Sequence, residues 1–276
     1  MKLAFSSNAF KRFSLEETII SIAGIGYSGI EILCDLPHAY PPVFEKKMIN
    51  MTRDLLSKYS IQISNLNAFT LYAIKDTYHP SWIEDKKELR ELRVEHTKNC
   101  IKLAKKLGCK NISTEPGGPI DKNTKYYSRY KDLFIGEISA IARIAQTEGI
   151  KVLVEPEPGL LLENSTEFLS FIKNISSDYI RLNFDIGHFY CVREDPAELI
   201  YKLSDYIEHF HLADIAENRS HNHLIPGEGS INFESVFKAI KDIGYTGFIT
   251  VELYPYQENP KYAAAKSYEF LRNLTV

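Results

Sequence analysis

The stretch Leu182–Tyr190, LNFDIGHFY, brings an apolar run to an end on an acidic residue, and a histidine follows three positions later. At the end of a strand, Asp185 and His188 would direct a carboxylate oxygen and an imidazole into one space, which suits a divalent cation or a polyhydroxylated ligand. The same pair also fits a helix N-cap and a surface histidine. The rest of the chain decides between these interpretations, because a binding site needs partners at matching positions.

Short apolar runs and longer amphipathic segments alternate along the chain, and they do so eight times. The predicted strands are Lys2–Phe5, Gly29–Leu33, Ile61–Leu66, Lys110–Thr114, Lys151–Val154, Ile180–Phe184, Ile207–Leu212 and Gly247–Leu253. The predicted helices are Ser14–Ile25, Phe44–Tyr59, Lys87–Leu107, Tyr127–Glu148, Ser165–Ile175, Asp195–Tyr206, Phe233–Ile243 and Tyr262–Leu274. Ser14 and Glu17 form a capping box at the first helix. Gly108 and Gly149 are stop signals for two others.

Strands separated by helices imply parallel strands joined by right-handed crossovers. Eight such units in 276 residues suit a (β/α)8 TIM barrel, a fold of about 250 residues. A doubly wound sheet is the alternative, but no GxGxxG follows the first strand. No Pro-, Gly- or Ser-rich linker divides the series. We therefore expect one domain over residues 1–276.

The overall charge and the cysteines restrict the class of protein. A formal net charge of −3 argues against nucleic-acid binding, which relies on a basic face. The N-terminal MKLAFSSNAFKRF lacks the apolar core of about 7–15 residues of a signal peptide, and no run approaches the roughly 20 apolar residues of a membrane span. The four cysteines are scattered without a CxxC pair. We expect a cytoplasmic protein without nucleic-acid or membrane partners.

Polar residues stand at the carboxyl end of nearly every predicted strand, and in a barrel these ends meet in one pocket. They are Glu31, Asn65, Asn67, Thr114, Glu115, Glu155, Glu157, Asp185, His188, His209, His211 and Glu252. Buried carboxylates are costly without partners, so several that converge require a cation or shared protons. Glu157 points the same way as Glu155 if the strand continues, and otherwise it lies on the rim.

A divalent cation fits between the fifth and the eighth predicted strands. Glu155 ends the fifth strand and Glu252 the eighth, and Asp185 and His211 come from the two strands between them. His211 lies nearer its strand end than His209, which we assign to the core or to the support of a ligand. This oxygen-rich set favours Mn²⁺, with Co²⁺, Mg²⁺ and Zn²⁺ as alternatives, although structural Zn²⁺ prefers thiolate and imidazole.

Glu155 and Glu252 would form a pair of bases on two sides of this cation. One can remove a proton from a carbon next to a carbonyl, and the other can return it to a different face or carbon. No GxSxG motif points to a nucleophilic serine. The loop NRSHNHLIPGEG, residues 218–229, follows the seventh strand. Its Arg219, His221 and His223 are either surface residues or part of a lid that binds substrate hydroxyls or a carboxylate.

The motifs EPEP, FDIGH, HFHLAD, HNHLIPGEG and VELYP resemble those of the xylose isomerase-like TIM-barrel superfamily of sugar isomerases and epimerases. The motifs occur in the same order and span essentially the whole chain. Resemblance to the ketose 3-epimerases of this group implies that His188 and Arg219 contact substrate oxygens. It also implies an acid–base pair, Glu155 and Glu252, within a metal site formed by Glu155, Asp185, His211 and Glu252.

Two positions depart from the patterns of the sugar-converting members. In the 3-epimerases the arginine lies six residues after the metal-binding histidine, whereas Arg219 lies eight residues after His211. True xylose isomerases carry a lysine where this chain has Glu157. This difference argues against plain aldose–ketose isomerisation.

The superfamily also contains apurinic endonucleases, which hold three zinc ions. His223 matches one of their ligands, and His221 stands where they have an aspartate. Two further histidine ligands of the nucleases are replaced by Asn67 or its neighbours and by Glu115. Together with the net charge, these replacements argue against a nuclease.

We therefore predict a metal-dependent isomerase or epimerase of a small sugar or sugar-like keto compound, which transfers protons through a metal-stabilised enediolate. An inosose-type dehydratase on the same cage, an apurinic endonuclease and a non-catalytic sugar-binding barrel are the alternatives. Members of the superfamily are often dimers or tetramers, which implies a homo-oligomer. The predicted substrate contacts are His188, Arg219, Glu157, His223, Asn67 and Glu115.

Overall fold

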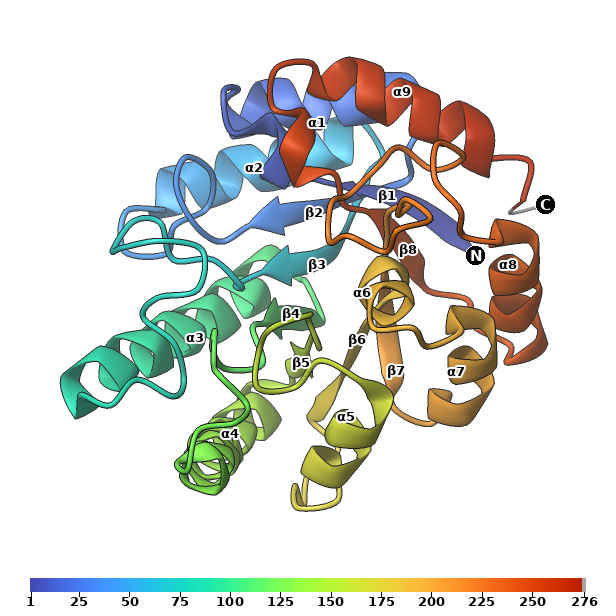
Figure 1. Ribbon diagram of the computed structural model, residues 1–276. Coiled ribbons are helices and arrows are strands. Elements are labelled where there is room, and N and C mark those ends of the chain that lie inside the picture. Colours follow the sequence, from blue (N-terminus) through green and yellow to red (C-terminus); the bar gives the residue numbers. More distant parts are fainter. Residues whose placement is uncertain (275–276) are drawn as a thin grey trace.

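The computed structural model describes residues 1–274, and its eight strands form a closed barrel in which neighbours along the chain are neighbours in the sheet (Figure 1). The barrel closes between the first and last strands, where Lys2 pairs with Phe248 in parallel register. This confirms the predicted (β/α)8 fold. The strands are β1 (Lys2–Ser6), β2 (Gly29–Leu33), β3 (Gln62–Asn67), β4 (Asn111–Thr114), β5 (Lys151–Val154), β6 (Ile180–Asp185), β7 (Ile207–Leu212) and β8 (Phe248–Val251).

Helices surround the barrel, and the last of them lies beside the first where the ring closes (Figure 1). The α-helices are α1 (Leu15–Ile25), α2 (Lys46–Lys58), α3 (Lys87–Leu107), α4 (Tyr127–Glu148), α5 (Ser165–Ile172), α6 (Ile186–Cys191), α7 (Pro196–Leu203), α8 (Phe233–Asp242) and α9 (Pro260–Leu271). Two 3₁₀ helices, η1 (Ser7–Phe10) and η2 (Tyr254–Tyr256), follow β1 and β8. Sequence analysis did not predict α6, η1 or η2. Among the described residues, no helix has the length and apolar character that a membrane crossing requires.

The predicted helix signals take the expected geometry. Both hydrogen bonds of the capping box between Ser14 and Glu17 are present at the start of α1. Gly108 ends α3 in the left-handed conformation with φ +76°, a region that favours glycine because a side chain would be strained there. Asp195 caps α7 through the backbone N–H groups of Ala197 and Glu198.

The two faces of the barrel strands differ in chemistry. Ile30 and Ile32 of β2 are buried in the apolar core, and the alternation of a strand directs Glu31 to the other face. The interior carries a connected polar network, in which the Asn183 amide and the Thr250 hydroxyl lie 2.8 Å from the two ring nitrogens of His209. This placement agrees with the assignment of His209 to the core. Buried polar groups that are paired in this way hold their side chains in defined positions.

Candidate metal centre and active site

Four side chains converge at the carboxyl ends of the last four strands. Each supplies one ligand atom, and these atoms all lie within 4.8 Å of one another. The residues are Glu155, Asp185, His211 and Glu252, and all four are buried. The structure therefore brings together the set that the sequence predicted as a metal cage.

His211 lies at the centre of this group. Its Nδ1 atom is 2.8 Å from Glu155 Oε1, 3.7 Å from Glu252 Oε2 and 4.0 Å from Asp185 Oδ2. The opposite ring nitrogen, Nε2, lies 2.6 Å from Glu31 Oε2. Burial disfavours the imidazolium, but the surrounding carboxylates outweigh it and hold the pKa of His211 well above its usual value. A carboxylate behind one ring nitrogen leaves the other free to bind a metal ion.

Glu31 fixes the orientation of the imidazole. Burial alone would raise the pKa of this carboxyl, but the charge and the hydrogen bond of His211 lower it to about 2. The ionised Glu31 also accepts hydrogen bonds from Ser6 Oγ and the Asn65 amide, both at 2.7 Å. Because Glu31 can only accept, Nε2 of His211 donates, and Nδ1 faces the three cage carboxylates.

The two oxygens of Asp185 fit both of the interpretations between which the sequence could not decide. Its Oδ1 atom accepts a 2.9 Å hydrogen bond from the backbone N–H of His188 and so caps α6. Its Oδ2 atom is buried and has no hydrogen-bond partner among the described residues. A buried carboxylate oxygen without a partner is costly, and a cation would satisfy it.

In each of the two cage glutamates, one carboxylate oxygen accepts a hydrogen bond from a side-chain amide. Asn183 donates to Oε2 of Glu155 at 2.8 Å, and Asn8 donates to Oε1 of Glu252 at 2.8 Å. Burial raises the pKa of both glutamates, and it holds that of Glu252 well above its usual value in spite of the attraction of His211. Crowded carboxylates of this kind are stabilised by a divalent ion, and three carboxylates with one imidazole fit an oxygen-preferring metal.

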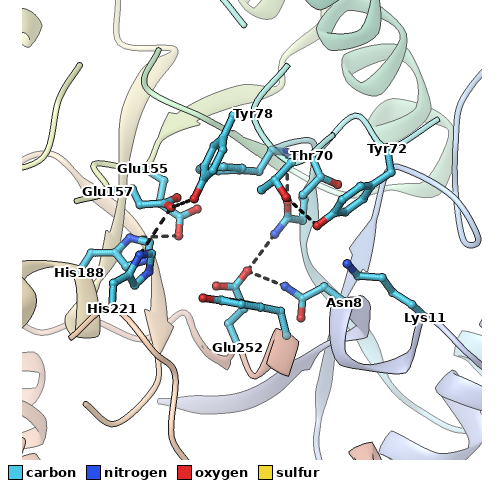
Figure 2. A pocket seen from close by; sticks show the side chains of 14 residues that line it. Asn8, Lys11, Thr70, Tyr72, Tyr78, Glu155, Glu157, His188, His221 and Glu252 are labelled. Carbon is cyan, nitrogen blue, oxygen red and sulfur yellow. Dashed lines mark hydrogen bonds and ion pairs between the residues drawn. The ribbon is translucent and has the colours of Figure 1, made fainter. Parts of the chain in front are cut away.

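A cavity of about 130 Å³ opens beside the cage. Figure 2 shows Glu155, Glu157, His188 and His221 at one end of this cavity and Lys11 and Tyr72 at the other, with Glu252 and Asn8 between. Charged and polar groups thus face a shared space from strand ends and loops that are distant in sequence. Such a cavity has room for a compact polar ligand rather than a single water molecule.

Three of the six predicted substrate contacts line this cavity. His188 is buried, and its Nδ1 atom lies 3.0 Å from the carbonyl oxygen of Pro156. Glu157 accepts a 2.6 Å hydrogen bond from Tyr78 Oη. Asn67 donates to Glu252 Oε1 at 3.3 Å. These side chains can reach a ligand in the cavity.

The other three predicted contacts are not among the residues that line it. Arg219 donates to the carbonyl of Tyr190 at 2.7 Å and stacks on that ring at 4.1 Å. The carboxylate of Glu115 lies 3.8 Å from the guanidinium of Arg93 and accepts a hydrogen bond from the backbone of Trp82. Their roles as substrate contacts stay predictions.

His223 belongs to a second group of imidazoles. Its Nδ1 atom lies 2.8 Å from the carbonyl oxygen of Glu252, and its Nε2 atom is buried without a hydrogen-bond partner among residues 1–274. Ring nitrogens of His188, His221 and His223 lie within 4.8 Å of one another. This nitrogen-rich group lies near the oxygen-rich cage, since His188 Nε2 is 3.8 Å from Asp185 Oδ2.

Several side chains of the site carried no assigned role at the sequence level. Glu31 stood among the polar strand ends, and its place between two isoleucines in GIEIL was the signal for a side chain inside the barrel. Asn8 and Lys11 follow β1 in or next to a short helix without a motif. Tyr78 lies in the β3–α3 loop, where no sequence pattern predicts that its hydroxyl reaches Glu157.

The barrel and the cage define a class of protein, a (β/α)8 barrel with a cluster of potential metal ligands at the carboxyl ends of its strands. The model of the xylose isomerase-like TIM barrel family matches residues 20–274, and the chain belongs to this family. The predicted resemblance is thereby confirmed.

Three comparisons place the chain within this family. It is 25% identical to fructoselysine 3-epimerase of Shigella flexneri, over 99% of this chain and 98% of the relative. It is 22% identical to inosose dehydratase of Clostridium beijerinckii, over 96% and 91% of the two chains. The crystal structure of a D-tagatose 3-epimerase-like protein superposes with a TM-score of 0.83 at 28% identity, over 99% and 97%. The relatives are thus sugar epimerases and inosose dehydratases.

Proposed function

We propose that this protein is a metal-dependent epimerase or isomerase of a small sugar or sugar-like keto compound. The convergence of Glu155, Asp185, His211 and Glu252 on one point carries this proposal. We further propose one divalent ion for each chain, with Mn²⁺ favoured by the oxygen-rich ligands, a single domain, a homo-oligomeric assembly and a cytoplasmic location.

Glu155 and Glu252 would exchange the proton with the substrate. A bound cation would supply polarisation of the substrate carbonyl, which makes the neighbouring C–H more acidic. Asn183 holds one oxygen of Glu155, and Asn8 and Asn67 hold one oxygen of Glu252. The other oxygen of each carboxylate faces His211. One glutamate would remove the proton on one face, and the other would return it on the opposite face.

An inosose-type dehydration on the same residues is the second candidate, and Glu157 favours it. Burial raises the pKa of Glu157 to about 8 against the effect of the Tyr78 hydrogen bond, so this carboxyl is mostly protonated at pH 7. Glu157 lines the cavity next to Glu155. A protonated acid in this place could give its proton to a leaving hydroxyl after Glu155 has removed the carbon-bound proton.

Solvent deuterium distinguishes these reactions. The Mn²⁺-loaded protein is incubated in D₂O with a panel of ketoses and inososes, and the recovered compounds are analysed by mass spectrometry and NMR. Epimerisation predicts one deuterium in the recovered or inverted ketose, whereas dehydration predicts a product that is lighter by one water. A panel without exchange or water loss would contradict the proposal and favour a sugar-binding barrel, and three tightly bound zinc ions with cleavage of abasic DNA would favour a nuclease.

A further inference from the structure

The end of the cavity opposite the cage carries a lysine with no carboxylate partner. Lys11 follows η1 and is half-buried, and its Nζ atom lies 4.1 Å from the centre of the Tyr72 ring. Within residues 1–274 no carboxylate lies within ion-pair distance of Lys11, whereas its neighbour Arg12 pairs with Glu258. Figure 2 shows the amine of Lys11 pointing toward Tyr72 at this end of the cavity.

The backbone beside this ring is held by a buried carboxylate, and Tyr72 itself is 40% exposed. Asp35 is fully buried, and its carboxylate accepts hydrogen bonds from the backbone N–H of Tyr72, from Ala73 N at 3.0 Å and from Thr70 Oγ1 at 2.9 Å. The Tyr72 hydroxyl lies 2.8 Å from Thr77 Oγ1. A cation that rests on an anchored aromatic face is oriented before a ligand arrives, which lowers the entropic cost of binding.

The two ends of the cavity are lined by different ionisable groups. Glu155 and Glu157 line the cage end, and Lys11 is the only cationic lysine or arginine that lines the cavity among the described residues. The ammonium group of Lys11 attracts an anionic group to its end of the cavity. A ligand with a polar sugar end and an anionic end has one favourable orientation in this field.

We propose that Lys11, held on Tyr72, binds an anionic group of the substrate, a carboxylate or a phosphate ester, at the end of the sugar away from the reacting carbons. This inference rests on the proposed sugar conversion and narrows its substrate class to sugar acids or sugar phosphates. Lys11 acts here as a specificity-determining residue. Its ammonium group suits a phosphate or carboxylate as a point charge with three donors.

Matched ligands test the inference by direct binding. Isothermal titration of the Mn²⁺-loaded protein compares D-fructose with two anionic ligands. Fructose 6-phosphate carries a phosphate ester on C6, and in D-fructuronate C6 is a carboxylate. We expect at least one anionic ligand to bind about tenfold or more tightly than D-fructose, as for one charge-assisted contact. The two anionic ligands distinguish a phosphate site from a carboxylate site.

The Lys11→Met variant should remove this preference, so that the anionic ligands bind the variant no more tightly than D-fructose does, because the cationic partner of the anionic group is lost. Tyr72→Leu should lower the affinity for the anionic ligand, because the aromatic face under Lys11 is lost. Tyr72→Phe keeps this face and should retain more of that affinity. The control is Lys58→Met, since Lys58 rests on the ring of Tyr59 at 5.3 Å and does not line the cavity.

Three results would overturn the inference. They are equal affinity for the neutral and the anionic ligands, no measurable binding of either anionic ligand, and an anionic preference that survives in Lys11→Met. Failure of the proposed function is a separate result, because it appears as an absence of deuterium exchange in the wild-type protein whatever ligand binds.

Discussion

The two halves of the barrel mouth differ in what they contribute. The ends of β5 to β8 supply the four cage residues, three carboxylates and an imidazole. The ends of β1 to β3 supply groups that orient this cage, since Asn8 and Asn67 donate to Glu252 and Glu31 accepts from His211. We call the ends of β5 to β8 the reactive half, because the proposed proton transfer would occur there. We call the ends of β1 to β3 the aiming half, because their side chains orient the cage residues. Preorganisation of this kind places charges where they are needed before a substrate binds.

The largest expected effect comes from the reactive half. Glu252→Gln should lower proton exchange with the substrate by about 10²–10⁴-fold, because an amide cannot accept and return the proton. The metal-free variant should melt at or above the temperature of the wild type, since one of several crowded carboxylates has been removed. Exchange is followed by NMR in D₂O and melting by calorimetry. Exchange equal to that of the control Glu234→Gln, which alters an exposed residue of α8, would refute the assigned pair.

The same substitution outside both halves should affect folding instead. Glu115 follows β4, is fully buried and faces the fully buried Arg93. Burial raises the pKa of Glu115 to about 7 against the attraction of Arg93. At pH 8, where Glu115 is mostly ionised, Glu115→Gln leaves Arg93 without its counter-charge, and loss of one partner of a buried pair costs about 3–5 kcal/mol. Urea unfolding should show this loss of stability, and steady-state kinetics should show an unchanged KM. A raised KM at constant stability would instead support the predicted substrate contact.

The contact between Glu31 and His211 joins the two halves. Glu31→Gln removes the charge that fixes the Nε2–H of His211 and keeps the size of the side chain. We expect the affinity for Mn²⁺ to fall by about 10–100-fold, as for other groups that orient a metal-binding histidine. The control is Glu208→Gln, which breaks a contact with Lys151 away from the cage. Equal metal affinity in the wild type and Glu31→Gln would show that the aiming half is dispensable for the metal.

The residues that converge in the reactive half could be predicted from the sequence, but the contacts that orient them from the aiming half could not. The reason is physical. The bounds of β2, β5, β7, α3 and α4 match the prediction because apolar runs and terminal glycines mark them. Glutamates and histidines at strand ends are visible in the same pattern. The contacts that aim them join residues 180 and 244 positions apart, Glu31 with His211 and Asn8 with Glu252. No local pattern encodes such a pairing, since it depends on closure of the barrel.

Short elements were missed because they have too few residues for a period. Helix α6 has six residues, and its N-cap is Asp185, the residue for which an N-cap and a metal ligand were the alternative interpretations. Asp185 has two oxygens: Oδ1 caps the helix, and Oδ2, which has no hydrogen-bond partner among residues 1–274, faces the proposed cation site. One carboxylate can therefore serve both the N-cap and the proposed metal site, so the two interpretations do not exclude each other.

A buried histidine of the aiming half, His38, should make the stability of the fold depend on pH. It lies in the β2–α2 loop, is 2% exposed, and its ring nitrogens lie 3.1 Å from Ser7 Oγ and 3.2 Å from the carbonyl oxygen of Phe13. These contacts hold η1 and the turn after it, which carry Asn8 and Lys11. Burial lowers the pKa of His38 to about 4, so the folded protein keeps this imidazole neutral near pH 7.

Acid should therefore weaken the fold through His38. Between about pH 6.5 and pH 4 the unfolded chain binds a proton at this residue and the folded chain does not, so the stability present above pH 6.5 is lost as the pH falls. His38 contributes a slope of up to about 1.4 kcal/mol per pH unit in this window. His38→Gln should reduce the slope of the unfolding free energy by about this amount, measured by urea titration at pH 7, 6 and 5. Parallel slopes in the variant and the wild type would exclude a neutral His38 as the group that holds the aiming half in place.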